Sequence, residues 1–266
     1  MNDEIIQLIH PHTGDVHHIK PVTEGYGAAT TAVVAGEAGE FFVKATPNVA
    51  GGNLDAARRE AAINPFVLGI SPEILWQTEN DKWFVLAFEV VNARASDFLP
   101  GSPDLPTVVD VLDRVFAVPL PSVAADWQDT RWDRFATETE KALLRGQTLT
   151  HADIHGRNLL IGADHSWLVD WEWPTIGAAA IMPSCLAVQL VSSGHSPADA
   201  QALVSDCQAW KSASPGSLDA FAQANARMHH WFVKLRPEEE WLKAMATAAQ
   251  AWADHCGDGS DRASLE

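Results

Sequence analysis

The sequence is short of positive charge. Its 266 residues include 18 Lys and Arg against 35 Asp and Glu, which gives a net charge of −17. Nucleic acids and anionic membranes are bound through basic patches, so this balance argues against both as partners. A cationic ligand is compatible with the charge, but acidic surfaces also keep proteins in solution, and we attribute the charge to solubility first.

Cysteine is scarce, and the N-terminus has no leader pattern. Cys185, Cys207 and Cys256 stand far apart and in no metal-ligand spacing. We interpret them as reduced, mostly packed thiols of a cytoplasmic protein. The first residues, MNDEIIQLIH, lack the basic region and apolar stretch of a secretory signal peptide.

Long uncharged stretches are rare as well. Residues 176–194, IGAAAIMPSCLAVQLVSSG, are the one membrane candidate. Pro183, Gln189 and several serines interrupt this segment, and no basic flank marks an orientation. We expect a buried helix there and no membrane partner. Repeats, low-complexity tracts and coiled-coil heptads are also absent from the sequence.

The first third of the chain is rich in β patterns. Short β-prone runs alternate with glycine turns over residues 16–46, and Gly36 and Gly39 bracket a hairpin. Residues 54–63 combine good helix formers with an apolar stripe. The segment PEILWQTENDKWFVLAFEVV predicts a strand, an Asn-Asp turn and a second strand. These patterns together predict a small β-rich lobe with one helix.

Helical patterns dominate after residue 92. Helical periodicity begins at TVVDVLDRVFAV, continues over residues 131–145 and 198–211, and covers most of 217–253. Residues 149–174 are the one β-like interruption. The sequence therefore predicts an α+β protein with two lobes and a cleft between them. The expected domains are a β-rich N-lobe, residues 1–91, and a helical C-lobe, residues 92–266.

The β-like interruption reads LTHADIHGRNLLIGADHSWLVDWEWP, and its polar residues are unusually placed. NLLIG and WLVDW are expected to pair as strands around the turn ADHS. Asn158 and Asp170 are symmetric about position 164, so an antiparallel hairpin would set them opposite each other at its open end. Asp153 lies on the loop that leads to the same end. Converging hard oxygen ligands suit Mg²⁺, which also binds phosphate oxygens. The alternative, a merely soluble hairpin, would carry its acids at the turn.

This segment resembles a known catalytic signature. H-x-D-x-x-x-x-N followed by an Asp after a short hairpin is typical of protein kinases and their relatives. HADIHGRNLLI and LVDWE are similar to the HGDLHPGN and IDWE of the aminoglycoside phosphotransferase and choline-kinase-like family. The resemblance covers roughly residues 20–190. It implies a bilobal protein-kinase-like fold, in which residues 1–91 bind the nucleotide and residues 92–266 carry the catalytic loop, the metal site and the acceptor pocket. It also implies ATP and Mg²⁺ as cofactors, and transfer of the γ-phosphoryl group to a hydroxyl of a small molecule.

The resemblance also implies roles for individual residues. Asp153 would orient the acceptor hydroxyl and take its proton, while Asn158 and Asp170 would hold Mg²⁺. Lys44, in the strand pattern FFVKA, would hold the α- and β-phosphates and pair with Glu60 from helix 54–63. His151 is expected to shape the loop rather than to transfer protons.

Further nucleotide contacts are expected from backbone groups. Gly25 and Gly27, in TEGYGAAT, would offer amides to the phosphates. The carbonyl of Glu89 and the amide of Val91 would bind the adenine by resemblance. One position departs from the family, because Cys185 in PSCLAVQL stands where relatives have an Asp that braces the catalytic loop.

The acceptor implied by the resemblance is an aminoglycoside-like or other antibiotic. A metabolic alcohol such as choline, homoserine or methylthioribose is an alternative, and so is a nucleotide-binding pseudo-enzyme, which Cys185 favours. Residues 227–241, RMHHWFVKLRPEEEW, could form a wall for a cationic acceptor, although an acidic run after a proline is also typical of a helix start. Trp171 and Trp173 are expected to pack the hairpin, with contact to an acceptor as the alternative.

Four histidines near the N-terminus are candidates for a transition-metal site. His10, His12, His17 and His18 lie close together in the sequence but have no accompanying Cys or carboxylate set. We therefore interpret them as exposed hairpin residues.

Overall fold

The computed structural model describes residues 1–22, 29–128 and 130–263, with side chains up to residue 257. The chain divides into two units. The first consists of Met1–Ala93 and Val169–Trp173, and the second of Arg94–Leu168 and Pro174–Glu266. A short segment of the predicted C-terminal hairpin thus belongs to the first unit. The separate functions expected for residues 1–91 and 92–266 stay predictions.

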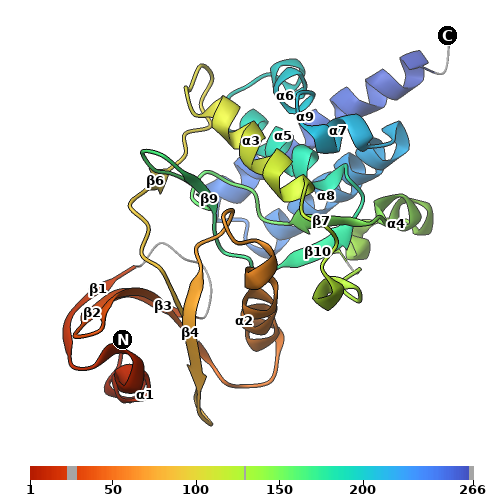
Figure 1. Ribbon diagram of the computed structural model, residues 1–266. Helices are drawn as coiled ribbons and strands as arrows, with labels where there is room; N and C mark the ends of the chain where they lie inside the picture. The colour runs from red at the N-terminus through yellow and green to blue at the C-terminus, as the bar shows by residue number, and fades with distance from the viewer. Residues whose placement is uncertain (23–28, 129, 264–266) are drawn as a thin grey trace. The chain divides into compact units, whose positions relative to one another are not determined.

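The first unit is built on a five-stranded antiparallel sheet (Figure 1). Its strand order is β1-β2-β3-β5-β4, with bounds Val16–Pro21, Thr30–Gly36, Gly39–Pro47, Ile74–Glu79 and Trp83–Phe88 for β1 to β5. The predicted hairpin turn is present, because Gly36 pairs with Gly39, and Gly39 has a φ of 128° that favours glycine. The predicted Asn-Asp turn is also present, where the Asn80 carboxamide accepts hydrogen bonds from the amides of Lys82 and Trp83.

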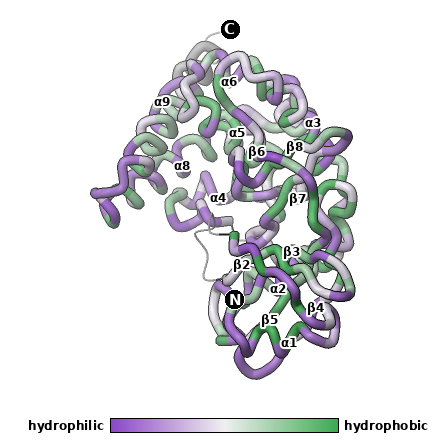
Figure 2. The backbone as a smooth tube through the Cα atoms, turned by 90° about the vertical axis from the view of Figure 1, so that its left-hand side faces the viewer, coloured by the Kyte–Doolittle hydropathy of each residue, from purple (hydrophilic) through white to green (hydrophobic). Residues whose placement is uncertain are grey.

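Two helices cover opposite faces of this sheet. Helix α1, Asp3–Thr13, places Ile5 and Ile9 in a buried cluster with residues of β2, β3 and β5. Helix α2, Gly52–Ile63, places Leu54 and Ala57 in a second cluster with Phe84, Leu86 and Phe88 of β5. The sheet is therefore apolar on both faces, and Figure 2 colours β5 mainly as hydrophobic.

Helix α1 was not predicted, and it contains His10 and His12, so the interpretation of these two as hairpin residues is wrong. The side chain of Asn2 caps its first turn by accepting a hydrogen bond from the amide of Ile5. The helix contains Pro11, which is unfavourable inside helices, and ends at Gly14 with a φ of 63°. Its stability comes from burial of Ile5 and Ile9 against the sheet, which no local pattern reveals.

Because both faces of the sheet are covered, the side chain of Lys44 is buried. Side chains alternate between the faces of a strand, so Val43 joins the α1 side and Lys44 the α2 side. Lys44 pairs with Leu86 of β5 in the ladder and is only 9% exposed. A lysine that is buried in this way needs charged partners.

The second unit is mainly helical. Its helices are α3 Leu105–Phe116, α4 Glu138–Leu144, α5 Ile181–Ser192, α6 Pro197–Val204, α7 Gln208–Ser212, α8 Pro215–Leu235 and α9 Glu240–Ala263. Helix α5 contacts α6, α8 and α9, and most of its side chains are buried. This confirms the buried helix predicted within residues 176–194. Among the described residues, no helix combines the length and the apolar character needed to cross a membrane.

Short strands and 3₁₀ turns complete the chain. The second unit has one ladder of β6 Arg94–Ala95, β8 Leu159–Ile161 and β9 Ser166–Leu168, and another of β7 Thr148–His151 with β10 Pro174–Gly177. The 3₁₀ turns are η1 Asn64–Phe66, η2 Ser122–Ala124 and η3 Asp133–Phe135.

Several predicted helices are interrupted. The region 131–145 contains η3 and then α4, because Thr137 forms a capping box with Glu140 and starts a new helix. The region 198–211 is split into α6 and α7. In the region 217–253, α8 ends before Pro237, whose ring cannot continue a helix, and α9 begins at Glu240.

The predicted C-terminal hairpin is present with a different register. Leu159 pairs with Leu168 and Leu160 with Trp167, so the hairpin is centred between residues 163 and 164 rather than on 164. The ladder ends at Leu159 and Leu168. The expectation that Asn158 and Asp170 form an opposed pair in this ladder is therefore wrong. Extended outward, this register would set Asn158 opposite Val169, and the φ of 66° at Asp170 is incompatible with an extended strand.

Candidate functional site

Lys44 is the centre of a charged cluster in the first unit. Its Nζ donates to Glu60 Oε2 at 2.7 Å and to Asp170 Oδ1 at 2.6 Å, and lies 3.1 Å from Glu172 Oε1. The Lys44–Glu60 pair expected from the sequence is thus present. Glu172 was not expected, although it is the last residue of the LVDWE motif. We call Lys44, Glu60, Asp170 and Glu172 the lysine cluster.

Electrostatics decide the charge states within the lysine cluster. Burial alone would lower the pKa of Lys44, but the charges of Glu60 and Asp170 outweigh it and raise that pKa, so the ammonium stays charged. Burial raises the pKa of Glu60 to about 7, against the opposing charge of Lys44. Three carboxyl groups therefore share a single ammonium group, so the lysine cluster can bind a further positive charge.

The lysine cluster fits a divalent metal ion. Carboxylate oxygens of Glu60, Asp170 and Glu172 lie within 4.8 Å of one another. Asp170 and Glu172 are 42% and 24% exposed, so a hydrated ion can reach them, whereas Glu60 is buried. Hard oxygen donors of this kind suit Mg²⁺, which keeps several water ligands. Among the described residues this is the one such group, and the N-terminal histidines do not form another.

Backbone strain coincides with the lysine cluster. Asp170 is the one described residue other than glycine with a positive φ. The next amide, that of Trp171, donates to Glu60 Oε1 at 3.1 Å, which ties the segment to helix α2. Strained backbone persists where surrounding contacts hold it, and it is common at functional sites. Glu60 therefore fixes both Lys44 and the segment that carries Asp170.

The two tryptophans beside Glu172 differ in environment. Trp171 is 1% exposed, as expected for a packing residue. Trp173 is 49% exposed, so it is packed only in part.

The expected nucleotide contacts are described only in part. Gly25 and Gly27 lie outside the described residues. Glu89 follows the last residue of β5, and its amide donates to the carbonyl of Glu73. Within the described chain, the Glu89 carbonyl and the Val91 amide have no protein hydrogen-bond partner. Both groups remain available to a ligand, and their role in binding adenine stays a prediction.

The loop that follows β7 carries the second group of predicted residues. The Asp153 amide donates to Nδ1 of His151, which is 2% exposed, so His151 shapes the loop as expected. Asn158 Nδ2 donates to the carbonyl of Asp153 at 3.0 Å and to its Oδ2 at 3.3 Å. These bonds leave Asn158 Oδ1 without a protein donor among the described residues. An amide oxygen in that state fits a metal ligand.

Asp153 is held as a carboxylate. Burial alone would raise its pKa, but the hydrogen bond with His155 and the charge of Arg131 outweigh burial and lower the pKa to about 2. His155 Nε2 lies 3.5 Å from Asp153 Oδ2. The side chain of Asp153 is 45% exposed, so a small molecule can approach it. An ionised, accessible carboxylate can orient a hydroxyl and accept its proton.

Arg131 is a neighbour of Asp153 that the sequence analysis missed. Its Nη1 donates to the carbonyl of Ala152 at 3.2 Å and lies 3.6 Å from Asp153 Oδ1. Cys185 is within reach of both charges, and burial raises the pKa of its thiol to about 12. A neutral thiol at this place cannot brace the loop as a carboxylate would, and Arg131 makes a loop contact instead. No local signal marked Arg131, which lies in a region expected to be helical.

The acidic run near the C-terminus has a structural explanation. Glu240 is the first residue of α9 and pairs with Lys243 at 2.6 Å. Glu239 accepts a hydrogen bond from the indole of Trp241 at 2.7 Å. These contacts agree with the interpretation of an acidic helix start, which is favourable near the positive end of a helix dipole. They give no support to a wall for a cationic acceptor.

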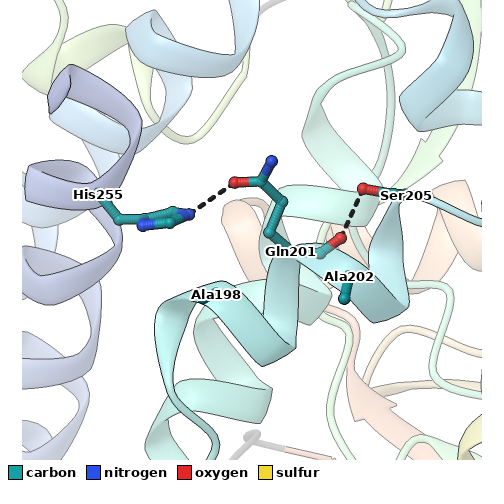
Figure 3. Close-up of a pocket in the computed structure, with 5 residues that line it drawn as sticks. All are labelled: Ala198, Gln201, Ala202, Ser205 and His255. Atoms are coloured by element: carbon teal, nitrogen blue, oxygen red, sulfur yellow. Dashed lines mark hydrogen bonds between the residues drawn. The ribbon is translucent and has the colours of Figure 1, made fainter. Parts of the chain in front are cut away.

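A hollow also lies between α6 and α9, lined by Ala198, Gln201, Ala202, Ser205 and His255 (Figure 3). His255 Nε2 and Gln201 Oε1 are 2.6 Å apart, and the Ser205 hydroxyl donates to the Gln201 carbonyl. Its polar side chains thus bond to one another or to the backbone, which suits packing between helices.

His229 on α8 predicts a pH dependence of stability. Burial, and then the charge of Arg131, lower its pKa from 6.5 to about 4. Between these values the unfolded chain binds a proton that the folded chain does not, so the free energy of unfolding falls as pH drops through this window. Above pH 6.5, His229 is neutral in the folded and the unfolded chain alike, so it no longer lowers the free energy of unfolding. We expect His229→Gln to reduce the loss of stability between pH 7 and about pH 5, measured by urea unfolding. His17→Gln, at an exposed site, should change nothing, and an unaltered pH dependence in His229→Gln contradicts the assignment.

Comparison with known proteins gives matches at the level of structure. No family model and no curated protein matches the sequence. The choline kinase LicA from Streptococcus pneumoniae matches with a TM-score of 0.63 and 10% identity, over 95% of this chain and 99% of that one. The spectinomycin phosphotransferase APH(9)-Ia, solved with ADP and spectinomycin, matches with a TM-score of 0.60 and 12% identity, over 96% and 94%.

A third solved structure has a different antibiotic bound. A thermostable mutant of the aminoglycoside phosphotransferase APH(4)-Ia, in a ternary complex with AMP-PNP and hygromycin B, matches with a TM-score of 0.62 and 13% identity, over 95% of this chain and 98% of that one. The antiparallel sheet with its helices, followed by a helical region, confirms the predicted fold class. The chain has the α+β kinase-like fold of the aminoglycoside phosphotransferases and choline kinases.

Proposed function

We propose that the protein transfers the γ-phosphoryl group of ATP to a hydroxyl group of a small molecule. The observation that supports this best is the lysine cluster, in which a buried lysine is shared by three carboxyl groups on a kinase-like fold. A purely structural ion pair would balance one lysine with one carboxylate. The excess of carboxylates next to a phosphate-binding type of residue is suited to a nucleotide with its metal ion.

The lysine cluster would bind the phosphates. Lys44 would contact the α- and β-phosphates, and Glu60 would keep the lysine in place. Asp170 is proposed as the principal metal ligand, with Glu172 as a neighbouring carboxylate and Asn158 as a ligand through Oδ1. When bound, Mg²⁺ would neutralise charge on the phosphates. Gly25, Gly27 and the backbone at Glu89 and Val91 are proposed for the rest of the nucleotide.

Asp153 would act on the acceptor. Its carboxylate would accept a hydrogen bond from the acceptor hydroxyl and take the proton as transfer proceeds. The hydroxyl oxygen forms a bond to the γ-phosphorus, the bond from that phosphorus to the β,γ-bridging oxygen breaks, and ADP leaves with the electron pair. Such catalysis is mainly positioning and stabilisation of charge. The low pKa of Asp153 keeps it ionised and ready for this contact.

The chemical class of the acceptor is a separate proposal. The matched structures include enzymes named for spectinomycin and choline, and one bound to hygromycin B. An antibiotic acceptor, and hence a role in resistance, therefore remains one proposal, and a metabolic alcohol another. Supply of ATP and Mg²⁺, together with three cysteines that form no disulfide, favours the cytoplasm as the location.

The proposal is tested by turnover. Purified protein should release ADP from ATP in the presence of Mg²⁺ and a hydroxyl compound, and the phosphorylated compound should be identifiable by mass spectrometry. The compounds should span aminoglycosides, choline, homoserine, sugars and hydroxy acids. Nucleotide binding by calorimetry without turnover on any compound would instead support a nucleotide-binding pseudo-enzyme. Absence of ATP binding in the presence of Mg²⁺ would contradict both the phosphotransferase and the pseudo-enzyme.

Magnesium is expected to stabilise the folded protein even without nucleotide. A ligand that binds only the folded state stabilises it by about 2.7 kcal/mol at a hundred times its Kd. We therefore expect a rise in Tm with Mg²⁺ that is lost in Asp170→Asn and kept in Asp164→Asn, an exposed position in the hairpin turn. Sodium chloride at equal ionic strength controls for screening of the net charge of −17. Equal shifts in both variants would mean that the ion acts by screening alone.

A further inference from the structure

Arg131 is held between two anchored neighbours. Trp132 is 1% exposed, and its indole N–H donates to Asn225 Oδ1 of α8 at 2.9 Å. On the other side, the hydroxyl of Thr130 donates to Asp133 Oδ1 at 2.7 Å. The backbone at Arg131 is therefore fixed, and its long side chain extends from a rigid base. Rigid support of this kind is what precise recognition requires.

The guanidinium of Arg131 is only partly used by the protein. One nitrogen, Nη1, donates to the Ala152 carbonyl and lies 3.6 Å from the Asp153 carboxylate. For Nε and Nη2, the part of the chain that the structure describes supplies no hydrogen-bond acceptor. The side chain is 36% exposed. A planar fork of donors thus remains open beside Asp153, and such a fork matches the two oxygens of a carboxylate or phosphate.

Among the residues that the structure describes, Asp153 is the carboxylate that lies next to Arg131. The charges that act on Cys185 are those of Arg131 and Asp153, and the charges that act on His229 are those of Arg131 and His230. Cys185 is a neutral thiol, and His229 is neutral above about pH 4. Within the described part of the chain, Asp153 is therefore the one carboxylate whose charge acts on Cys185 or His229.

Other carboxylates of the same region have their own arginine partners. Asp133 accepts two hydrogen bonds from Arg145, at 3.0 and 2.5 Å. Glu140 accepts one from Arg227 at 2.5 Å. An ammonium group brought next to Asp153 would meet Arg131 at close range and find no unpaired carboxylate among these residues. Like charges at such a distance repel, and the exposed arginine would lose hydration without compensation.

We propose that Arg131 recognises the acceptor and that the acceptor carries an anionic group, a carboxylate or a phosphate, close to the hydroxyl that Asp153 orients. This inference rests on the proposed function for the role of Asp153. It names the acceptor class as hydroxy acids or phosphorylated alcohols rather than polycationic antibiotics. The open edge of the guanidinium would bind the anionic group, while Nη1 keeps its contact with the catalytic loop.

The test compares compounds that differ mainly in charge. Each compound carries a hydroxyl. Glycerate and glycerol 3-phosphate are anionic, glycerol is neutral and choline is cationic. Binding is measured by calorimetry on the whole protein with AMP-PNP and Mg²⁺, and turnover with ATP. We expect an anionic compound to bind more tightly than glycerol and choline. Arg131→Met should weaken that binding by roughly 10- to 100-fold, the scale of lost hydrogen bonds to a charged group.

Two variants separate recognition from loop positioning. Arg131→Lys keeps the charge but not the fork, so it should restore part of the affinity for the anionic compounds. Arg134→Gln is the matched control, since this arginine lies nearby in the sequence and stacks over Trp231 at 4.2 Å. It should bind all four compounds as the parent does. Unchanged Tm and AMP-PNP affinity in Arg131→Met would exclude a folding defect.

The outcomes are distinct. An Arg131→Met variant that loses all four compounds equally, or only kcat, would make Arg131 a positioning residue of the loop and overturn the proposal. Tighter binding of choline or glycerol, or binding of none of the four, also overturns it. Phosphorylation of a neutral or cationic compound would leave the proposed function standing without this inference. Arg131-dependent binding of the anionic compounds without phosphoryl transfer would support recognition by Arg131 and contradict the proposed function.

Discussion

Asp170→Asn is expected to abolish most magnesium-dependent turnover while the protein stays folded. The substitution keeps the size of the side chain and, since asparagine tolerates positive φ, the φ of 66° at this position. It removes the most exposed carboxylate of the lysine cluster and the partner of Lys44 Nζ at 2.6 Å. We expect kcat to fall by at least about 10²–10³, the scale of one lost preorganised electrostatic contact to developing charge.

The matched control is Asp164→Asn in the turn of the same hairpin. Asp164 is exposed and should tolerate the change with unaltered turnover. Steady-state rates are measured over a series of Mg²⁺ concentrations, with Tm as the check on folding. Parental turnover of Asp170→Asn at saturating Mg²⁺ would refute the metal assignment, and a loss that excess Mg²⁺ restores would mean that Asp170 contributes affinity only.

Asp153→Asn is expected to lower the rate of transfer without changing nucleotide affinity. Asparagine can still contact the hydroxyl but cannot accept its proton. The rate should fall by about 10²–10⁴, the usual contribution of a positioned general base. Asn158 donates to both the carbonyl and the carboxylate of Asp153, and only the second bond changes. The loop should therefore keep its conformation.

Calorimetry and kinetics together test this prediction. ATP affinity should stay near that of the parent, because none of the lysine cluster is altered. A rise in the acceptor KM at normal kcat would mean that Asp153 contributes uniform binding instead of catalysis. If the variant binds ATP and also turns over normally, the proposed mechanism is wrong. A pseudo-enzyme predicts no acceptor-dependent turnover in the parent, so nothing would be lost.

Local patterns were sufficient for much of the fold. The strand pattern around Lys44, the helix that carries Glu60 and the turns at Gly36–Gly39 and Asn80 were all predicted from spacing and turn chemistry. The buried helix within residues 176–194 was predicted from its uncharged composition. These features depend on residues close in sequence, so short-range periodicity is enough to specify them. The Lys44–Glu60 pair followed from the motif resemblance and is present at 2.7 Å.

Other features depended on contacts that no local pattern encodes. Helix α1 exists because Ile5 and Ile9 have a sheet face to cover, and a helix with an internal proline has little stability alone. The hairpin register differed because the turn centres the hairpin between residues 163 and 164, and the positive φ at Asp170 keeps that residue out of the ladder. The helix predicted over 131–145 was interrupted by a capping box at Thr137.

The sequence by itself determined which residue types could do chemistry, namely a strand lysine, a helical glutamate and the aspartates and asparagine of one polar segment. The tertiary structure alone decided how they are grouped. Lys44 and Asp170 are 126 positions apart and meet at 2.6 Å, and Glu172 joins them. Arg131 reaches the loop of Asp153 from an unmarked segment. Burial on both faces of the sheet makes the lysine need its carboxylates, and burial is a property of the packed chain rather than of any segment of it.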